Sequence, residues 1–389
     1  MNTEFSRLSE KYRSELLENI IPFWEKHSID RDNGGFFTCL DRQGRVYDTD
    51  KFIWLQGRQV WMFASLYNHL QKNERWLKIA EDGAAFLEKY GRDTEGNWYF
   101  SLTSEGKPLI SPYNIFSDCF ATMAFAQLSK ATGKAAYSEI AVNTFNNILK
   151  RADNPKGIYE KSVPGTRPIR GFSLPMILCN LALETEHLLD KKTVENIIRK
   201  CIRDVMEVFY DPFSGLIREN VTADGGFSDS FEGRLINPGH GIEAMWFIMD
   251  LAERNNDSTL AEKAVERTLN ILNYGWDDRY GGIFYFMDIK GKPLQQLEWD
   301  QKLWWVHVET LISLIKGYRH TKKPECLEWF RKVHEYTWLH FPDPEFGEWY
   351  GYLNRRGEIL LDLKGGKWKG CFHIPRGLYQ VWKTLEKLS

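Results

Sequence analysis

Three sequence features are missing from this chain, and each absence argues against a class of protein. The six cysteines lie far apart without a C-x-x-C pair, which predicts reduced thiols rather than a disulfide framework; they are Cys39, Cys119, Cys179, Cys201, Cys326 and Cys371. The 51 basic and 53 acidic residues form no run of one sign, so neither nucleic acid nor a membrane surface is an expected partner. No run of about 18 apolar residues is present. These observations predict a cytoplasmic protein with a small, roughly neutral ligand.

A repeat of about 60 residues runs through the chain. Segments rich in glycine and aromatic residues recur around marker glycines that are 58 to 66 residues apart, at Gly34, Gly96, Gly157, Gly215, Gly281 and Gly347. Each segment alternates apolar and polar residues, and most are followed by a turn such as DRQG, TSEG or NRRG. This pattern predicts a short β-hairpin at every marker.

Two stretches with helical spacing of apolar residues lie between successive markers. The predicted helices are 3–27, 54–72, 74–91, 115–132, 134–151, 171–189, 191–210, 238–255, 258–275, 301–320, 323–341 and 370–387. A helix pair cannot bury its apolar face alone, so the six pairs must stack. Closure into a ring removes exposed ends, which favours an all-α (α/α)6 barrel of twelve helices, with hairpins at one mouth, as a single domain over 1–389. An open solenoid is the alternative.

Unusual polar residues gather where the even-numbered helices begin. The sets are Arg58 with Trp54 and Trp61, Asn114 with Asp118, His240 with Glu243, Lys302 with Trp305 and Glu309, and His373 with Arg376. Within each set the spacing is three or four residues, which places the side chains on one helix face. If the even-numbered helices form the inner ring, these residues converge on one pocket at the hairpin mouth.

His240 and His373 are the main candidates for chemistry. Each opens a predicted inner helix after a glycine-containing turn and has an ionisable neighbour one turn further on. Histidine exchanges protons near neutral pH, because its ordinary pKa is about 6.5. The role of His307 stays open, because it is two residues from Glu309 and cannot fully share its helix face.

Three of the remaining polar candidates have a structural alternative. Arg58 lies at an expected core position, where an unpaired guanidinium is costly, so we expect it to pair with Glu243 or Glu309 or to face a ligand. Asn114 and Asp118 could instead cap the helix that follows them.

A metal or phosphate-loop site is not predicted. The chain has no H-x-x-x-H pair and no histidine-cysteine cluster. The segments ATGK (131–134) and LKGGKWKG (363–370) lack the spacing G-x-x-x-x-G-K-[ST] of a nucleotide phosphate loop.

Five segments resemble the N-acylglucosamine 2-epimerases, a family in which some members are called renin-binding proteins. They are NPGHGIEAMWF, GWDDRYGGIFYF, LEWDQKLWWVHVE, DPEFGEWYGYLNRRG and KGGKWKGCFHIPRGL. The likeness extends over nearly the whole chain. Related cellobiose 2-epimerases and aldose–ketose isomerases carry a further histidine in the sixth helix, whereas 170–180 here reads RGFSLPMILCN. The resemblance is therefore to the N-acylglucosamine branch.

The resemblance implies roles for several residues. His240 and His373 correspond to the acid/base pair of the family, Glu243 to a carboxylate that orients histidine, and the supporting positions are Arg58, Glu309 and Arg376. It further implies interconversion of N-acetylglucosamine and N-acetylmannosamine without a metal or redox cofactor, a homodimer, and activation by ATP that is not consumed.

Epimerisation at C2 of an open-chain aldose fits two histidines, because one group must remove the proton and another must return it to the opposite face. The enolate formed between these steps carries charge that Arg58, Arg376 or Lys302 would stabilise. The alternatives are an aldose–ketose isomerase or another sugar 2-epimerase, a glycosidase that uses carboxylates, and a non-enzymatic module that binds glycans or a protein.

Overall fold

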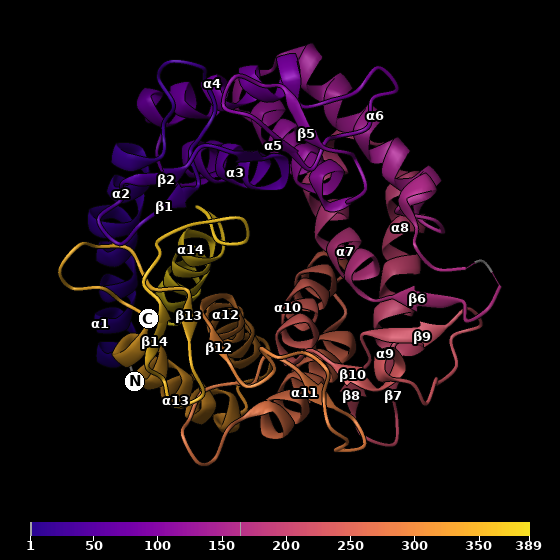
Figure 1. Cartoon of the computed structure of the whole chain (residues 1–389). Helices are drawn as coiled ribbons and strands as arrows, with labels where there is room; N and C mark the ends of the chain where they lie inside the picture. Colours follow the sequence, from indigo (N-terminus) through magenta and orange to yellow (C-terminus); the bar gives the residue numbers. More distant parts are fainter. Residues whose placement is uncertain (1, 164) are drawn as a thin grey trace.

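The computed structural model describes residues 2–163 and 165–389 and shows two concentric rings of helices (Figure 1). The inner ring consists of α3 (Ile53–His69), α5 (Phe116–Thr132), α7 (Ser173–Thr185), α10 (Pro238–Asn255), α12 (Trp304–Thr321) and α14 (His373–Glu386). The outer ring consists of α1 (Asn2–Ser14) with a π-helical turn (Glu15–Ile20) and α2 (Ile21–His27), then α4 (Glu74–Tyr90), α6 (Ala135–Arg151), α8 (Lys191–Arg203), α11 (Ser258–Gly275) and α13 (Pro324–His340). All twelve predicted helices are present. The prediction of a single domain over 1–389, which includes Met1 and Pro164 outside the described residues, stays a prediction.

The two rings differ in how their helices are buried. Every residue of α12 from Trp304 to Gly317 is buried, whereas α4 buries one face and exposes the other. A helix enclosed on all sides is expected to be apolar nearly all round, and an outer helix needs only one apolar stripe. The polar residues buried on inner helices therefore stand out as exceptions to the pattern.

The ring is closed, which excludes the open solenoid. Tyr12 of the first outer helix bonds to His334 of α13 through its hydroxyl, 2.9 Å from Nδ1. On the inner side, Trp61 of α3 contacts Phe372, the residue before α14, with ring centroids 5.3 Å apart. Residues from the two ends of the chain thus complete both rings, and the predicted (α/α)6 barrel is confirmed.

Short strands line one mouth of the barrel, where the inner helices begin. Four local hairpin contacts are β1 (Cys39–Leu40) with β2 (Val46–Asp48), β4 (Ser101–Leu102) with β5 (Pro108–Ile110), β7 (Tyr210–Asp211) with β8 (Leu216–Ile217), and β13 (Tyr352–Leu353) with β14 (Ile359–Leu361). Strands from successive loops also pair: β3 (Lys51–Phe52) with β4, β6 (Ile169–Gly171) with β9 (Asn220–Thr222), β10 (Leu235–Ile236) with β11 (Met287–Asp288), and β12 (Lys302–Leu303) with β13. All eight pairings are antiparallel, and the second set ties neighbouring loops together.

The marker glycines share one backbone conformation. All six have a positive φ, from 55° at Gly157 to 85° at Gly96. Side chains disfavour this conformation and glycine does not, so the turn after each outer helix fixes the residue type at the marker. The sequence repeat therefore records a repeated turn.

The hairpin predicted at the third marker is wrong, and at the fifth marker, Gly281, the strand β11 pairs with β10 of the preceding loop instead of forming a local hairpin. Residues 155–163 contain a 3₁₀ turn (Gly157–Tyr159) and no strand. No side chain from Arg151 to Val163 is buried, and Ile158 is 91% exposed. Without an apolar face against the barrel, an isolated two-stranded hairpin has little to stabilise it.

The predicted helix 301–320 begins three residues late, because Lys302 and Leu303 form β12. A short helix, α9 (Phe231–Arg234), was not predicted. Within the described residues, no helix combines the length and the apolar composition needed to cross a bilayer.

Candidate active site

His240 lies in the first turn of α10, and its position is fixed by the local sequence. Asn237 is the N-cap, and its side-chain oxygen accepts the His240 backbone N–H at 3.1 Å. Pro238 follows at the first helical position, where its fixed φ suits a helix start. The imidazole Nδ1 lies 3.1 Å from both carboxylate oxygens of Glu219, so Glu219 accepts the Nδ1–H.

His373 is the first residue of α14 and is held by a different helix. Its Nδ1 lies 2.7 Å from Oε1 of Glu309 on α12, which accepts the proton. The Nε2 atoms of both His373 and His240 have no hydrogen-bond partner in residues 2–163 and 165–389. Each imidazole is thus anchored through Nδ1 and leaves Nε2 available for proton transfer.

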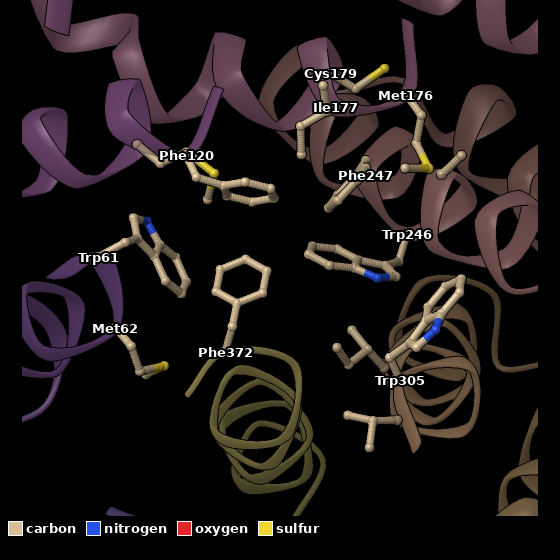
Figure 2. Close-up of a cluster of buried hydrophobic side chains, with 14 of the residues drawn as sticks. Trp61, Met62, Phe120, Met176, Ile177, Cys179, Trp246, Phe247, Trp305 and Phe372 are labelled. Carbon is tan, nitrogen blue, oxygen red and sulfur yellow. The ribbon is translucent and has the colours of Figure 1, made fainter. Parts of the chain in front are cut away.

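Trp305 of α12 brings the two histidines into one site. Its ring centroid lies 5.2 Å from that of His240 and 5.7 Å from that of His373. Figure 2 shows Trp61, Phe120, Trp246 and Trp305 of the inner helices, together with Phe372 just before α14, projecting toward the centre of the barrel. Both imidazoles therefore lie against aromatic rings, with His373 buried and His240 partly exposed.

Arg376 connects the two carboxylates of the site. Its Nη2 donates to Oε1 of Glu243 at 2.5 Å and to Oε1 of Glu309 at 2.7 Å. Glu309 accepts a third bond from Trp246 Nε1, at 2.9 Å from Oε2. Such charge-assisted bonds fix both carboxylates in one arrangement.

Arg58 of α3 is buried and has no ion-pair partner among the residues that the structure describes. Its guanidinium carbon lies 4.0 Å from the ring centroid of Phe120, 4.7 Å from that of Trp54 and 4.9 Å from that of Phe372. The buried Nε has no hydrogen-bond partner in the described part of the chain. Burial lowers the pKa of Arg58 to about 9, so the side chain is still cationic at neutral pH. The expected ion pair with Glu243 or Glu309 is not formed in the described residues, and the alternative, that Arg58 faces a ligand, stays a prediction.

Glu243 does not orient the histidine that the resemblance implied. It binds Arg376, and the carboxylate at Nδ1 of His240 is Glu219, from the loop before α9. Glu219 belongs to the fourth marker segment, FSGLIRENV, which the sequence analysis interpreted only as a hairpin. No spacing signal links it to His240, because the contact depends on how that loop folds back over α10.

Two further candidates on α12 and its approach are bound elsewhere. The Lys302 ammonium donates to Asp277 at 3.2 Å within the mouth loops, and burial lowers its pKa to about 8. His307 accepts the Ile283 N–H at Nε2 and donates from Nδ1 to the Leu303 carbonyl, at 3.1 and 2.7 Å. Both ring nitrogens are used, and burial lowers the pKa of His307 to about 3, so it is a neutral structural residue.

Asn114 and Asp118 also face away from the histidines. The side-chain oxygen of Asn114 accepts the N–H of Phe116, the first residue of α5, at 2.9 Å; Asn114 thus satisfies a backbone donor at this helix start, although the N-cap residue itself is Ile115. Asp118 pairs with Arg151 of α6 at 3.2 Å, and burial raises its pKa to about 7. The capping alternative is wrong for Asp118, which tethers an inner helix to an outer one.

One group of side chains in the described residues has the spacing of a metal site. Its members are Glu243, Glu309 and His373, with one ligand atom of each within 4.8 Å of the others. Nη2 of Arg376 already binds two of these three atoms. The positive charge that a cation would supply is provided by a guanidinium, so the donor set fits an ion-pair cluster better than a metal centre.

Residues 35–375 match the sequence model of the N-acylglucosamine 2-epimerase (GlcNAc 2-epimerase) family. The chain belongs to this family. It is similar to N-acylglucosamine 2-epimerase of Rattus norvegicus, with 40% identity over 96% of this chain and 90% of the rat protein. Cellobiose 2-epimerase of Bacteroides fragilis is 25% identical over 95% of this chain and 97% of its own length.

The fold is shared with a solved structure of cellobiose 2-epimerase from Bacillus thermoamylovorans B4167. The TM-score is 0.84 at 22% identity, covering 98% of this chain and all of the other. The protein is an isomerase of the epimerase family. Its sequence identity to the N-acylglucosamine 2-epimerase relative is higher than its identity to the cellobiose 2-epimerase.

Proposed function

We propose that this chain is an N-acylglucosamine 2-epimerase that interconverts N-acetyl-D-glucosamine and N-acetyl-D-mannosamine. The observation that carries the proposal is the pair of imidazoles, His240 and His373, which start separate inner helices and both contact Trp305. The 40% identity to the rat enzyme over nearly the full chain supports the choice of substrate.

Two imidazoles with free Nε2 atoms suit the two proton transfers of the reaction. One removes the C2 proton of the open-chain aldehyde, and the other returns a proton to C2 from the opposite face. In the reverse direction the two exchange roles. The carboxylates at Nδ1, Glu219 and Glu309, hold each ring in the tautomer that presents Nε2 to the sugar.

The intermediate between these transfers is an enolate with negative charge on O1. Arg58 provides a buried cation that no carboxylate in residues 2–163 and 165–389 neutralises by direct contact. A charge held ready in an apolar surround stabilises a developing anion more strongly than it would in water. We therefore assign Arg58 to O1 of the enolate.

A glycosidase mechanism is less well supported. Glu243 and Glu309 are the two carboxylates closest to the histidines on the inner helices, and the same nitrogen of Arg376 binds both. A glycosidase needs the sugar between its two carboxylates. Here a guanidinium occupies that space, and two anchored histidines would have no role.

An aldose–ketose isomerase and another sugar 2-epimerase are the nearest alternative functions. An N-acetyl group at C2 prevents collapse of the enolate to an ordinary ketose, so an acetylated substrate favours epimerisation. Assays with mannose, glucose and cellobiose separate these activities. A non-enzymatic glycan- or protein-binding module would bind its ligand in a calorimeter without turnover.

The family resemblance also supports three properties that we propose with the activity. These are activation by ATP that is not consumed, a homodimer, and a cytoplasmic role in amino-sugar metabolism linked to sialic acid. ATP dependence and the mass in solution are read from an assay with and without ATP and from light scattering.

The test of the activity is proton NMR of the protein with N-acetylmannosamine in deuterium oxide, with and without ATP. We expect N-acetylglucosamine to appear with deuterium at C2, because the returned proton comes from a group that exchanges with solvent. Neither product nor loss of the C2 proton signal under both conditions would refute the proposal.

A further inference from the structure

Glu219 is held rigidly between the starts of two inner helices. Its backbone N–H donates to the Leu235 carbonyl at 3.2 Å, two residues before the Asn237 cap of α10. Its carbonyl accepts the N–H of Phe172, the residue before α7, at 2.9 Å. The residue is 8% exposed. A side chain fixed in this way has a defined direction, and that direction is toward His240.

The carboxylates of the two histidines are not equivalent. The Oε1 atom of Glu309 binds both His373 and Arg376, so part of the charge of Glu309 is already neutralised. Glu219 places both oxygens at the same distance from Nδ1 of His240 and forms no ion pair with a lysine or arginine in the described residues. The full charge of Glu219 therefore acts on His240.

The charged groups around the two rings differ in their balance: two carboxylates face His240 with no lysine or arginine among them, whereas the two carboxylates near His373 are offset by two guanidinium groups. Those facing His240 are Glu219 from the mouth loop, Glu243 from α10 and His373 from α14, and the uncharged ring of Trp305 lies beside it. Those facing His373 are Arg58 from α3, Arg376 from α14, Glu309 from α12, and Glu243 and His240 from α10. His240 has an anionic surround, whereas two guanidinium groups approach His373.

We propose that Glu219 is the positioning residue of His240 and makes the pair unequal: before substrate binds, His240 carries a proton on both nitrogens and His373 has a free Nε2. This inference rests on the proposed epimerase activity only for its catalytic consequence. For the epimer whose C2 proton faces His373, His373 takes that proton and His240 gives its Nε2 proton to the other face; the opposite epimer reacts from the reverse protonation state, and proton exchange with solvent interconverts the two states. After the step His373 is the cation and His240 is neutral.

The proton affinities agree with this geometry. Burial disfavours a charged His240, but the charge and hydrogen bond of Glu219 outweigh it and raise the pKa of His240. For His373, burial and then the charge of Arg58 hold the pKa well below its usual value. The same reaction therefore starts from one acid and one base rather than from two identical groups.

The decisive experiment measures His240 directly, by NMR titration of protein labelled with ¹³C-histidine. A His240→Gln sample assigns the signal among the nine histidines. In Glu219→Gln we expect the titration midpoint of His240 to fall, because a neutral amide cannot stabilise the imidazolium. The matched control is Glu232→Gln, which removes an exposed carboxylate of α9 at the same mouth and should leave the midpoint unchanged. Equal midpoints in wild type and Glu219→Gln would overturn the inference.

Kinetics of the same variants provide the catalytic readout. Glu219→Gln should lower kcat by about tenfold, as expected when a residue that orients a catalytic group is lost, and should move the alkaline limb of the kcat/KM profile to lower pH. If neither limb of the pH profile shifts, the assignment of Glu219 is contradicted. If Glu219→Gln does not fold, Glu219→Asp is the second variant, because it keeps the negative charge. The titration midpoint of His240 in Glu219→Asp should stay above that of free histidine. A midpoint below that of free histidine overturns the inference. If the wild type has no epimerase activity, the proposed function fails and the NMR comparison still decides the role of Glu219.

Discussion

Two sets of buried charges lie near the same mouth, and they differ in how fully their hydrogen bonds are made. The loop anchors are the ion pairs Lys51–Asp30, Lys302–Asp277 and Lys364–Asp343. The central cluster is Arg58, Glu243, Glu309, His373 and Arg376. Each lysine of a loop anchor is fully buried beside an aspartate that lies four residues before a marker glycine.

Each lysine of the loop anchors has at least two hydrogen-bond acceptors. Lys51 has three donors and meets three acceptors: Asp30 at 2.7 Å and the carbonyls of Gly34 and Ser104 at 2.6 and 2.8 Å. In the central cluster, Nε of Arg58 and both Nε and Nη1 of Arg376 are buried without a partner in the described residues. An unmet buried donor is costly. The comparison indicates that the first set maintains the scaffold and that the second reserves donors for a ligand.

The largest effect is expected from breaking a loop anchor. Asp277 binds Lys302 at 3.2 Å and Arg355 at 3.0 Å, so Asp277→Asn leaves a buried ammonium without its carboxylate. We expect the free energy of unfolding to fall by about 3–5 kcal/mol, measured by denaturant titration, with kcat of the folded enzyme nearly unchanged.

Asp82→Asn, in the exposed pair with Lys78, is the control and should change stability little. Loss of kcat in Asp277→Asn at unchanged stability would place this loop anchor in the catalytic machinery and end the distinction between the two sets.

A slightly smaller effect is expected from the histidines of the site. His240→Ala and His373→Ala should each lower kcat by about 10²-fold or more, measured in the N-acetylmannosamine assay, because each removes one proton-transfer group. His307→Ala is the contrast on α12: it should lower the melting temperature and retain kcat. A near-native rate in either His240→Ala or His373→Ala would remove the two-base mechanism.

The smallest effect, and the most specific, is expected at Arg58. Arg58→Met keeps an apolar stem among the aromatic rings and removes the unpaired charge. We expect kcat to fall by about tenfold while the melting temperature rises, because a buried charge without a partner destabilises the fold. A fall in melting temperature would show that Arg58 contributes to the scaffold as the loop anchors do.

The sequence predicted the barrel well because its signals are local. Turn geometry requires glycine at the markers, and the inner and outer helices differ in apolar pattern, so the period and the twelve helices follow from short windows of sequence. The position of His240 at a helix start is equally local, since Asn237 and Pro238 specify that start. His373 was placed by the same kind of evidence.

The errors have a common cause in contacts between distant residues. Residues 155–163 alternate like the other markers, but nothing in the barrel covers them. Strands such as β3 and β12 pair with the following loop, which no local turn signal encodes. Lys302 has helical spacing to Glu309, but its ammonium group binds Asp277, which lies 25 residues earlier in the chain.

By itself, the sequence determined the repeat, the helices and the two histidines that begin inner helices, because each depends on residues within a turn or two of one another. The tertiary structure decided which charges meet. Glu219 reaches His240 across 21 residues, Glu309 reaches His373 across 64, and Arg376 reaches Glu243 across 133. Coulomb and hydrogen-bond energies depend on distance in space, and only the packing of loops and helices in the folded barrel sets those distances.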